Sequence, residues 1–195
     1  MHSYSTNTSR LGTYSVIAAI SVAIAVLIAK LTSHYNLGPT WLVSPPALGG
    51  VYGIVYATVD KILWKWTPLR MFGLINEMRV YGVYEGIVIS DYNHKELPVR
   101  IEINQTWTKI LVQLEVLEPE LSASCSITTS VEGMGNRCAR LTYTYRNTPN
   151  HGIADDDMQG HEGTGELIIK PNGTARGRYF NSRGRKGTLR LNRSN

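Results

Sequence analysis

Residues 98–104, with the sequence PVRIEIN, decide the fold class of this chain. The apolar residues Val99, Ile101 and Ile103 alternate with a polar residue at each position between them. Successive side chains of a β-strand point to opposite faces, so this period of two is typical of a strand with one buried and one solvated face. The stretch therefore predicts a strand of a half-buried sheet.

The same alternation extends to both sides of this stretch. It gives eight candidate strands: MRVYGVYEGIVI (78–89), PVRIEIN (98–104), KILVQLEV (109–116), LSASCSITTSV (121–131), RLTYTYR (140–146), GELIIK (165–170), TARGRYFN (174–181) and GTLRLNR (187–193). Most of the connections are short and turn-like, which pairs sequential strands antiparallel. Closing such a sheet removes both of its edges. We predict a small antiparallel eight-stranded β-barrel, with a two-sheet sandwich as the alternative.

The polar faces of these strands carry charge, as Arg100 and Arg140 illustrate. A membrane barrel would instead expose an apolar belt to lipid, so the predicted barrel is expected to lie in water. A barrel of this strand number has room inside for side chains or for one small ligand. The sequence thus indicates a cytoplasmic barrel that is able to hold a ligand.

The N-terminal part of the chain is apolar in two long blocks. Leu11 to Ala29 and Trp41 to Val59 are runs of 19 residues each without a charge. At about 1.5 Å per residue, either run can cross the ~30 Å hydrocarbon layer of a bilayer as a helix. We predict a two-helix transmembrane hairpin with spans at 11–31 and 41–60 and an external connector at 32–40. The alternative for the first run is a cleaved signal peptide, although its length exceeds the usual apolar region of about 7 to 15 residues.

Cations flank these spans unequally. One end of the hairpin carries most of them: Arg10, Lys61, Lys65 and Arg70. Lys30 and the titratable His34 lie at the other end. Because Lys and Arg accumulate on the cytoplasmic side of a membrane, both termini are predicted to be cytoplasmic. The expected order is a cytoplasmic N-terminus at 1–10, the hairpin, a juxtamembrane linker at 61–77 and the barrel at 78–195. Pro68 is expected to break a continuation of the second helix.

No catalytic motif is present, and we expect no enzymatic activity, no cofactor and no metal. One loop does contain residue types that bind metals: His151, Asp155, Asp156, Asp157 and His161. Such a set can hold a divalent cation. An acidic loop of this kind is more often simply solvated, and that is the interpretation we adopt.

Positive charge collects at the C-terminus. The chain has 20 Lys and Arg against 15 Asp and Glu, and seven of the cations but no acid lie between Thr174 and Asn195. Six of the seven are Arg, whose planar group matches phosphate oxygens in bidentate geometry. Arginines beside aromatic rings suit a nucleotide, because the charge attracts phosphate and the rings stack on bases. The alternative is that these arginines face an anionic membrane leaflet.

Strand parity and chemistry select the candidate ligand-binding residues. Three rings share a face with apolar or small residues and are expected to line the interior: Tyr143, Tyr145 and Tyr179. The set is completed by two further rings, two cations for phosphates and two polar partners: Tyr84, Trp107, Arg178, Arg190, Asn181 and Thr188. If Leu189 and Leu191 point inward, Arg190 points outward and contributes only at a mouth of the barrel.

Small residues form a ladder on each predicted span. The two ladders are Ser15, Ala19 and Ala23 on the first span, and Gly49, Gly53 and Ala57 on the second. Small residues let helix backbones approach closely in lipid, so both faces favour helix association. The contacts are either within one hairpin or between protomers, and the sequence leaves both open.

Two apolar spans followed by a β-rich domain that ends in GRYFNSRGRKGTL resemble a known family. The most specific pattern is Gly177, Tyr179, Arg183, Gly187 and Leu189. The chain resembles the SMODS-associating two-transmembrane, β-strand-rich effectors, also called CD-NTase-associated membrane effectors of CBASS antiphage defence. The resemblance covers essentially the whole chain.

The resemblance implies a function for each part of the chain. Its barrel would bind a cyclic nucleotide second messenger, the protein would form a homo-oligomer in the lipid bilayer of the bacterial inner membrane as a multi-pass protein, and membrane disruption would kill the infected cell. No DNA or RNA polymer is an expected partner. The alternatives are a membrane-tethered barrel that binds a lipid or other apolar ligand, and a structural assembly protein with a filled barrel.

Overall fold

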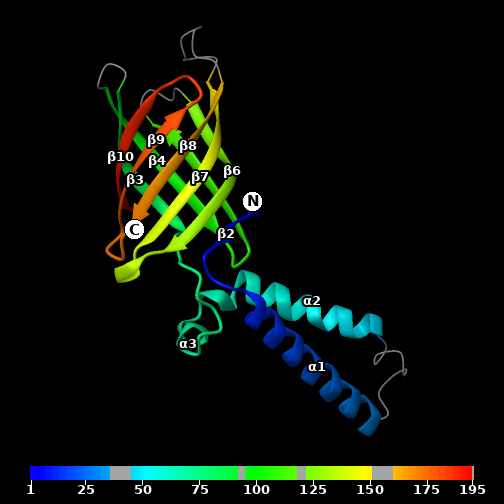
Figure 1. The fold of residues 1–195 in the computed structure, drawn as a ribbon. Helices are drawn as coiled ribbons and strands as arrows, with labels where there is room; N and C mark the ends of the chain where they lie inside the picture. The colour runs from blue at the N-terminus through cyan, green and yellow to red at the C-terminus, as the bar shows by residue number, and fades with distance from the viewer. Residues whose placement is uncertain (36–44, 92–94, 118–121, 151–159, 195) are drawn as a thin grey trace. The chain divides into compact units, whose positions relative to one another are not determined.

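The alternating stretches of the sequence become the strands of one closed sheet (Figure 1). The computed structural model describes residues 1–35, 45–91, 95–117, 122–150 and 160–194. It divides the chain into two units, residues 1–7 together with 77–195, and residues 8–76. The first unit contains the sheet and the second contains the long helices.

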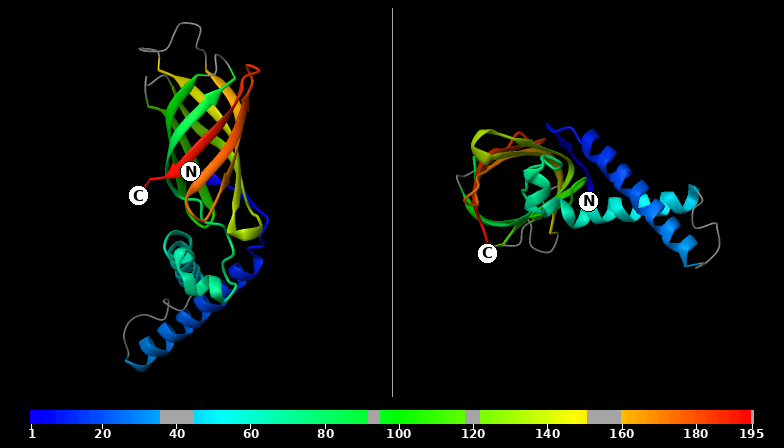
Figure 2. Two further views of the ribbon diagram at one scale, coloured as in Figure 1. Left: turned by 90° about the vertical axis from the view of Figure 1, so that its left-hand side faces the viewer. Right: turned by 90° about the horizontal axis from the view of Figure 1, so that it is seen from below.

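Eight antiparallel strands form the barrel: β3 (Gly82–Ser90), β4 (Glu96–Gln105), β5 (Lys109–Val116), β6 (Ser122–Gly133), β7 (Ala139–Pro149), β8 (His161–Ile169), β9 (Thr174–Asn181) and β10 (Lys186–Arg193). Each strand pairs with the next, and β10 pairs with β3, so the ring is closed. The view from below in Figure 2 shows this ring. The predicted eight-stranded barrel is confirmed, and a two-sheet sandwich is excluded because the ladder around β3 to β10 has no break.

The buried faces of the strands are the predicted ones. Val99, Ile101 and Ile103 are each at most 2% exposed, and Leu141, Leu189 and Leu191 are buried in the same core. Their sequence neighbours on each strand lie on the outer surface, as the alternation requires. Burial of this continuous apolar surface is the main term that stabilises the barrel.

The first residues of the chain complete the seam between β5 and β6. These two strands pair directly only over Gln113–Glu115 and Ala123–Cys125. Beyond this stretch β1 (His2–Ser3) pairs with β5, and β2 (Ser5–Thr6) runs parallel to β6. Residues 1–10 were predicted to lie apart from the barrel, because two-residue strands are too short to show any alternation in the sequence.

A buried polar cluster holds this segment in the seam. The Tyr4 hydroxyl donates to the Trp107 carbonyl at 2.9 Å, and Gln105 Nε2 donates to the Tyr4 hydroxyl at 3.1 Å. The other side of the Gln105 amide accepts the backbone N–H of Val80 at 2.9 Å. The Gln105 side chain thus binds both the N-terminal segment, through Tyr4, and the segment that leads into β3, through Val80. Residues 1–7 therefore belong to the fold of the barrel.

The helical unit contains α1 (Leu11–His34), α2 (Pro45–Lys61), η2 (Leu63–Lys65) and α3 (Thr67–Met71). Helix α1 has 24 residues and is the one helix in the described ranges that is long and apolar enough to cross a membrane. It packs against α2, where the rings of Tyr14 and Tyr56 stack with centroids 6.4 Å apart. The first predicted span is therefore matched by a suitable helix.

The second predicted span is less complete. Helix α2 has 17 residues, and the start of the span and most of the predicted connector, residues 36–44, fall outside the described residues. The second span thus stays a prediction. The linker also differs from expectation: the helix ends at Lys61, and Pro68 lies in the first turn of α3, where its missing N–H costs nothing.

Candidate functional site

Three tyrosines lie on the inner wall of the barrel, and two of them share one row across the strands. Tyr143 pairs across the sheet with Gly165, Gly165 pairs with Tyr179, and Tyr179 pairs with Gly187. Tyr143 and Tyr145 are 3% and 7% exposed, and Tyr179 is half-buried against the same core. The predicted interior position of all three rings is confirmed, and their role in ligand binding stays a prediction.

Glycines on the neighbouring strands make room for these rings. A Cβ at Gly163 would lie 2.5 Å from the Tyr145 hydroxyl oxygen, and one at Gly165 would lie 2.5 Å from Tyr143 Cζ. A Cβ at Gly187 would lie 2.6 Å from Tyr179 Cε1. Each ring therefore runs sideways along the wall and occupies the space that a neighbouring side chain would fill. Rings held along a wall in this way are suited to stacking on a flat ligand.

Burial keeps the two inner phenols neutral. Desolvation is the main cause that raises the pKa of Tyr145 to about 12, and burial also raises the pKa of Tyr143 strongly. A raised pKa means that the hydroxyl keeps its proton at every pH below that value. Both groups can therefore donate a hydrogen bond to a ligand throughout the physiological range.

Asn147 continues the same inward face of β7 beyond Tyr145. Its side chain is 6% exposed, and its Nδ2 donates to Ser122 Oγ at 3.0 Å and to Ser124 Oγ at 2.9 Å. Its Oδ1 has no hydrogen-bond partner among the described residues, although a buried acceptor normally has one. This oxygen is positioned to accept a hydrogen bond from a ligand or a water.

The turn between β9 and β10 places cations beside this part of the interior. Asn181 Oδ1 accepts the backbone N–H groups of Arg183 and Arg185 at 3.1 and 3.0 Å, which shapes the turn. Asn181 pairs with Gly163, the residue under the Tyr145 ring. We call the end of the barrel where β7 ends, β8 begins and this turn lies the loop end. Arg183 and Arg185 are thus on its rim.

These residues define the tyrosine chamber: Tyr143, Tyr145, Tyr179, Asn147 and Asn181, with Gly163, Gly165 and Gly187 beneath the rings. It combines ring faces, neutral donors and a buried acceptor near a cationic turn. Such a set can bind a planar, phosphate-bearing molecule by stacking and hydrogen bonds. Among the interior-facing positions of the chamber that the structure describes, none is Lys or Arg.

Three predicted residues lie outside the barrel. Arg178, Thr188 and Arg190 are exposed, because their neighbours Tyr179, Leu189 and Leu191 occupy the inward positions of the same strands. Arg178 forms a weak ion pair with Glu166, with the nitrogen and oxygen 3.8 Å apart. The expectation that Arg178 and Thr188 take part in an interior site is therefore corrected, whereas the outward position of Arg190 follows, as predicted, from the inward Leu189 and Leu191. All three exposed side chains lie on the outer face of β9 and β10.

Two predicted rings lie toward the other end of the barrel. The Tyr84 hydroxyl donates to the Val80 carbonyl at 3.1 Å, and burial is the main cause that raises the pKa of this phenol. Trp107 is fully buried in the turn between β4 and β5. Neither ring is part of the tyrosine chamber.

The acidic loop falls mainly outside the described residues. This applies to His151, Asp155, Asp156 and Asp157. His161 is described, pairs with Asn147 and has its ring 6.3 Å from that of Tyr145. In the described ranges no group of three or more metal-ligating side chains is found.

Asn147 and the three glycines beside the rings were not among the predicted site residues. RLTYTYR ends one residue before Asn147, yet the parity of Tyr143 and Tyr145 extends directly to it. A polar residue at an inward strand position was the available signal. The glycines carried a weaker one, because Gly163 and Gly165 alternate with Thr164 just as an inward face does.

The small-residue ladders face away from the contact between α1 and α2. Ser15, Ala19 and Ala23 are exposed on α1, whose buried residues are Thr13, Ile17 and Ser21. A Cβ at Gly49 or Gly53 would meet no atom of the described chain within 4 Å, and Ala57 is half-buried. The structure does not support the interpretation that these ladders pack one hairpin internally. In the single chain, Ser15, Ala19, Ala23, Gly49 and Gly53 are exposed.

Two comparisons with known proteins cover these features. A protein-family model described as "Cap15, cyclic dinucleotide receptor domain" matches residues 79–193, more than half of the chain. Over 201 aligned positions the chain is 29% identical to CD-NTase-associated protein 15 of Yersinia aleksiciae. The alignment covers 96% of this chain and 92% of that protein. The matched range contains all strands from β3 to β10 and therefore the whole tyrosine chamber.

Proposed function

The chain belongs to the Cap15 cyclic dinucleotide receptor family, as its sequence resemblance suggested, and we propose that it is a CBASS effector that binds its messenger in the tyrosine chamber. The observation that carries this proposal is the row of Tyr143 and Tyr179 over Gly165 and Gly187, inside the matched range. Ring faces on the inner wall of the barrel suit the flat bases of such a ligand.

Each part of a cyclic dinucleotide has a partner in the chamber. The rings of Tyr145 and Tyr179 supply stacking surfaces, and the neutral phenols donate hydrogen bonds. The unpartnered Asn147 Oδ1 is suited to accept a hydrogen bond from an amino or imino group of a base. Arg183 and Arg185 on the rim supply positive charge for the two phosphates. All of these contacts are binding contacts, and we propose that the protein is a receptor and not an enzyme.

The helical unit is the effector part of this proposal. Helix α1 supplies one membrane span, and α2 with the residues before it supplies the second, so that both termini are cytoplasmic. Ligand binding by the barrel promotes self-association of these helices in the bacterial inner membrane, and the assembled helices disrupt the bilayer. The exposed small-residue ladders support this step, because they leave helix faces available for close contact between protomers.

The test is a titration of the full-length protein, in a neutral detergent, with a panel of cyclic di- and trinucleotides. We expect saturable binding of at least one cyclic dinucleotide by calorimetry, and a linear dinucleotide of the same bases serves as the control. Absence of binding across the panel would refute the proposal. Lipid found by mass spectrometry in place of a nucleotide would favour the alternative, a barrel that binds an apolar ligand.

The assembly step predicts a specific effect of one glycine. Gly53→Leu should block close helix contact and reduce ligand-induced oligomerisation and toxicity at least tenfold, while cyclic dinucleotide affinity stays within twofold. Gly50→Leu is the matched control, because Gly50 is equally exposed on α2 but lies off the ladder. Chemical cross-linking in membranes and a plating assay measure the two effects. Equal toxicity of Gly53→Leu and the parent protein would remove the ladder from the mechanism.

A further inference from the structure

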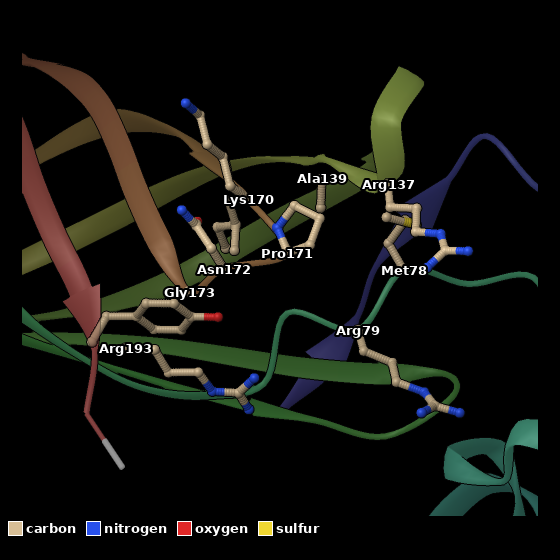
Figure 3. A pocket seen from close by; sticks show the side chains of 11 residues that line it. Met78, Arg79, Arg137, Ala139, Lys170, Pro171, Asn172, Gly173 and Arg193 are labelled. Atoms are coloured by element: carbon tan, nitrogen blue, oxygen red, sulfur yellow. The ribbon is translucent and has the colours of Figure 1, made fainter.

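A separate pocket lies toward the other end of the barrel, which we call the turn end because the β6–β7 and β8–β9 turns are there (Figure 3). It has a volume of about 240 Å³. Its walls come from the start of the barrel segment, the two turns and the end of β10: Met78, Arg79, Tyr84, Arg137, Ala139, Ile169, Lys170, Pro171, Asn172, Gly173 and Arg193. The pocket shares no residue with the tyrosine chamber.

Four of the lining residues are cations, and among the described residues that line the pocket none is acidic. Arg79, Arg137, Lys170 and Arg193 come from four separate segments of the chain. In Figure 3 the guanidinium groups of Arg137 and Arg79 lie on the right, that of Arg193 lies below, and the Lys170 side chain extends toward the top. Like charges that line one small space repel one another, and an anion between Arg137, Lys170 and Arg193 would lower that repulsion. The amide of Asn172 adds a neutral polar group to the same wall.

Arg193 is held in position at this pocket. Its Nη2 donates to the Tyr81 carbonyl at 2.6 Å, and its guanidinium lies 5.4 Å from the centre of the Tyr81 ring. A fixed guanidinium loses little freedom when it binds an anion, and its remaining N–H groups keep their fork geometry. The end of β10 thus presents a preorganised cation.

Arg137 has an unusual backbone for its residue type. Asn136 and Arg137 both have left-handed conformations, with φ values of 60° and 59°, in the tight turn between β6 and β7. In such a turn Asn followed by Gly is the favoured pair, because glycine adopts positive φ without steric cost. Arg137 therefore adopts a backbone conformation that is unfavourable for its residue type. Strained residues of this kind cluster at functional sites, and this one lines a pocket.

We infer that the turn-end pocket is a second anion site, distinct from the tyrosine chamber, which binds a single phosphate group. The phosphate is carried either by a small soluble anion or by the headgroup of an anionic phospholipid. Arg137 and Arg193 bind its oxygens, and Lys170 adds charge at the rim. The headgroup source is compatible with the chain path, because Met78 and Arg79 follow the helical unit after one residue.

The test uses the full-length protein in a neutral detergent and calorimetric titration with three probes: inorganic phosphate, dihexanoyl phosphatidylglycerol and dihexanoyl phosphatidylcholine. We expect saturable binding of phosphate, of phosphatidylglycerol or of both, and no binding of the zwitterionic lipid. Binding of phosphate identifies a soluble anion as sufficient, and binding of phosphatidylglycerol alone identifies the headgroup. Either result supports the site.

Arg137→Gly is the decisive variant, because glycine fits the left-handed turn and the fold should be at least as stable. It should weaken anion binding about fivefold, the effect of about one cation at such a surface, and leave cyclic dinucleotide binding unchanged. Arg100→Ala removes the same charge from the outer face of β4 and should change neither. The inference fails if no anion binds, if both lipids bind equally, if Arg100→Ala has the same effect, or if Arg137→Gly weakens cyclic dinucleotide binding equally.

Discussion

Gly177→Ala is expected to cause the largest loss of stability of any single methyl group added to this barrel. A Cβ at this position would lie 2.0 Å from the Glu166 carbonyl oxygen and 2.7 Å from Leu167 Cδ2 on the neighbouring strand. The first of these atoms belongs to the backbone, so the collision cannot be relieved by a side-chain rotation. Overpacking of this kind costs roughly 3 kcal/mol, and for a domain of this size that is a fall in Tm of roughly 10 °C.

Thermal unfolding of the full-length protein, followed by the circular dichroism of the sheet, measures this effect. Gly135→Ala is the matched control, because Gly135 lies in the β6–β7 turn and an added Cβ there meets no atom of the described chain within 4 Å. It should change Tm by no more than about 2 °C. An unaltered Tm for Gly177→Ala would mean that β8 and β9 are not paired in the register that places Leu167 opposite Gly177.

The period of two was sufficient to predict the barrel. Each alternating stretch became a strand within a few residues of its predicted bounds, because burial of one face fixes the facing of every side chain on that strand. β3 and β8 differ most. β3 begins four residues later than predicted, at Gly82. β8 begins at His161 and not at Gly165. Its first half has glycine at the inward positions, and glycine gives no apolar signal.

The same parity rule decided which candidate site residues are inside. It placed Tyr143, Tyr145 and Tyr179 correctly, and it also implied the outward position of Arg190 that the structure shows. Arg178 and Thr188 were chosen for their chemistry against that rule. Chemical suitability identifies a residue type, whereas parity decides whether the side chain can reach the site.

Other features depend on contacts that no local pattern contains. The seam segment, residues 1–7, joins the barrel through two-residue strands and through side-chain hydrogen bonds to distant residues, such as those of Tyr4 with Trp107 and Gln105. The turn-end pocket brings Arg79, Arg137 and Arg193 together from positions more than 50 residues apart in sequence. Closure of the ring creates both features, and a pattern read along one strand cannot report them.

Tyr179→Ala is expected to cause the largest loss of cyclic dinucleotide affinity that leaves the barrel folded. The ring lies over Gly187 on the inner wall, and its half-burial means that its removal disturbs packing less than removal of Tyr143 or Tyr145 would. Stacking of one base on one ring contributes roughly 1–3 kcal/mol, which corresponds to an increase in Kd of about 5- to 150-fold. Calorimetric titration of the full-length protein measures the change.

Two further variants separate stacking from other causes of a lower affinity. Tyr179→Phe keeps the ring and loses only the hydroxyl, so its Kd should stay within about threefold of the parent value, the effect of one exposed hydrogen bond. Phe180→Ala removes the next ring on β9, which is 61% exposed on the outer face, and should leave Kd unchanged. If Phe180→Ala weakens binding as much as Tyr179→Ala does, the nucleotide is bound outside the barrel. In that case the outward Arg178 and Arg190 return as its phosphate partners, because both lie on the same outer face as Phe180.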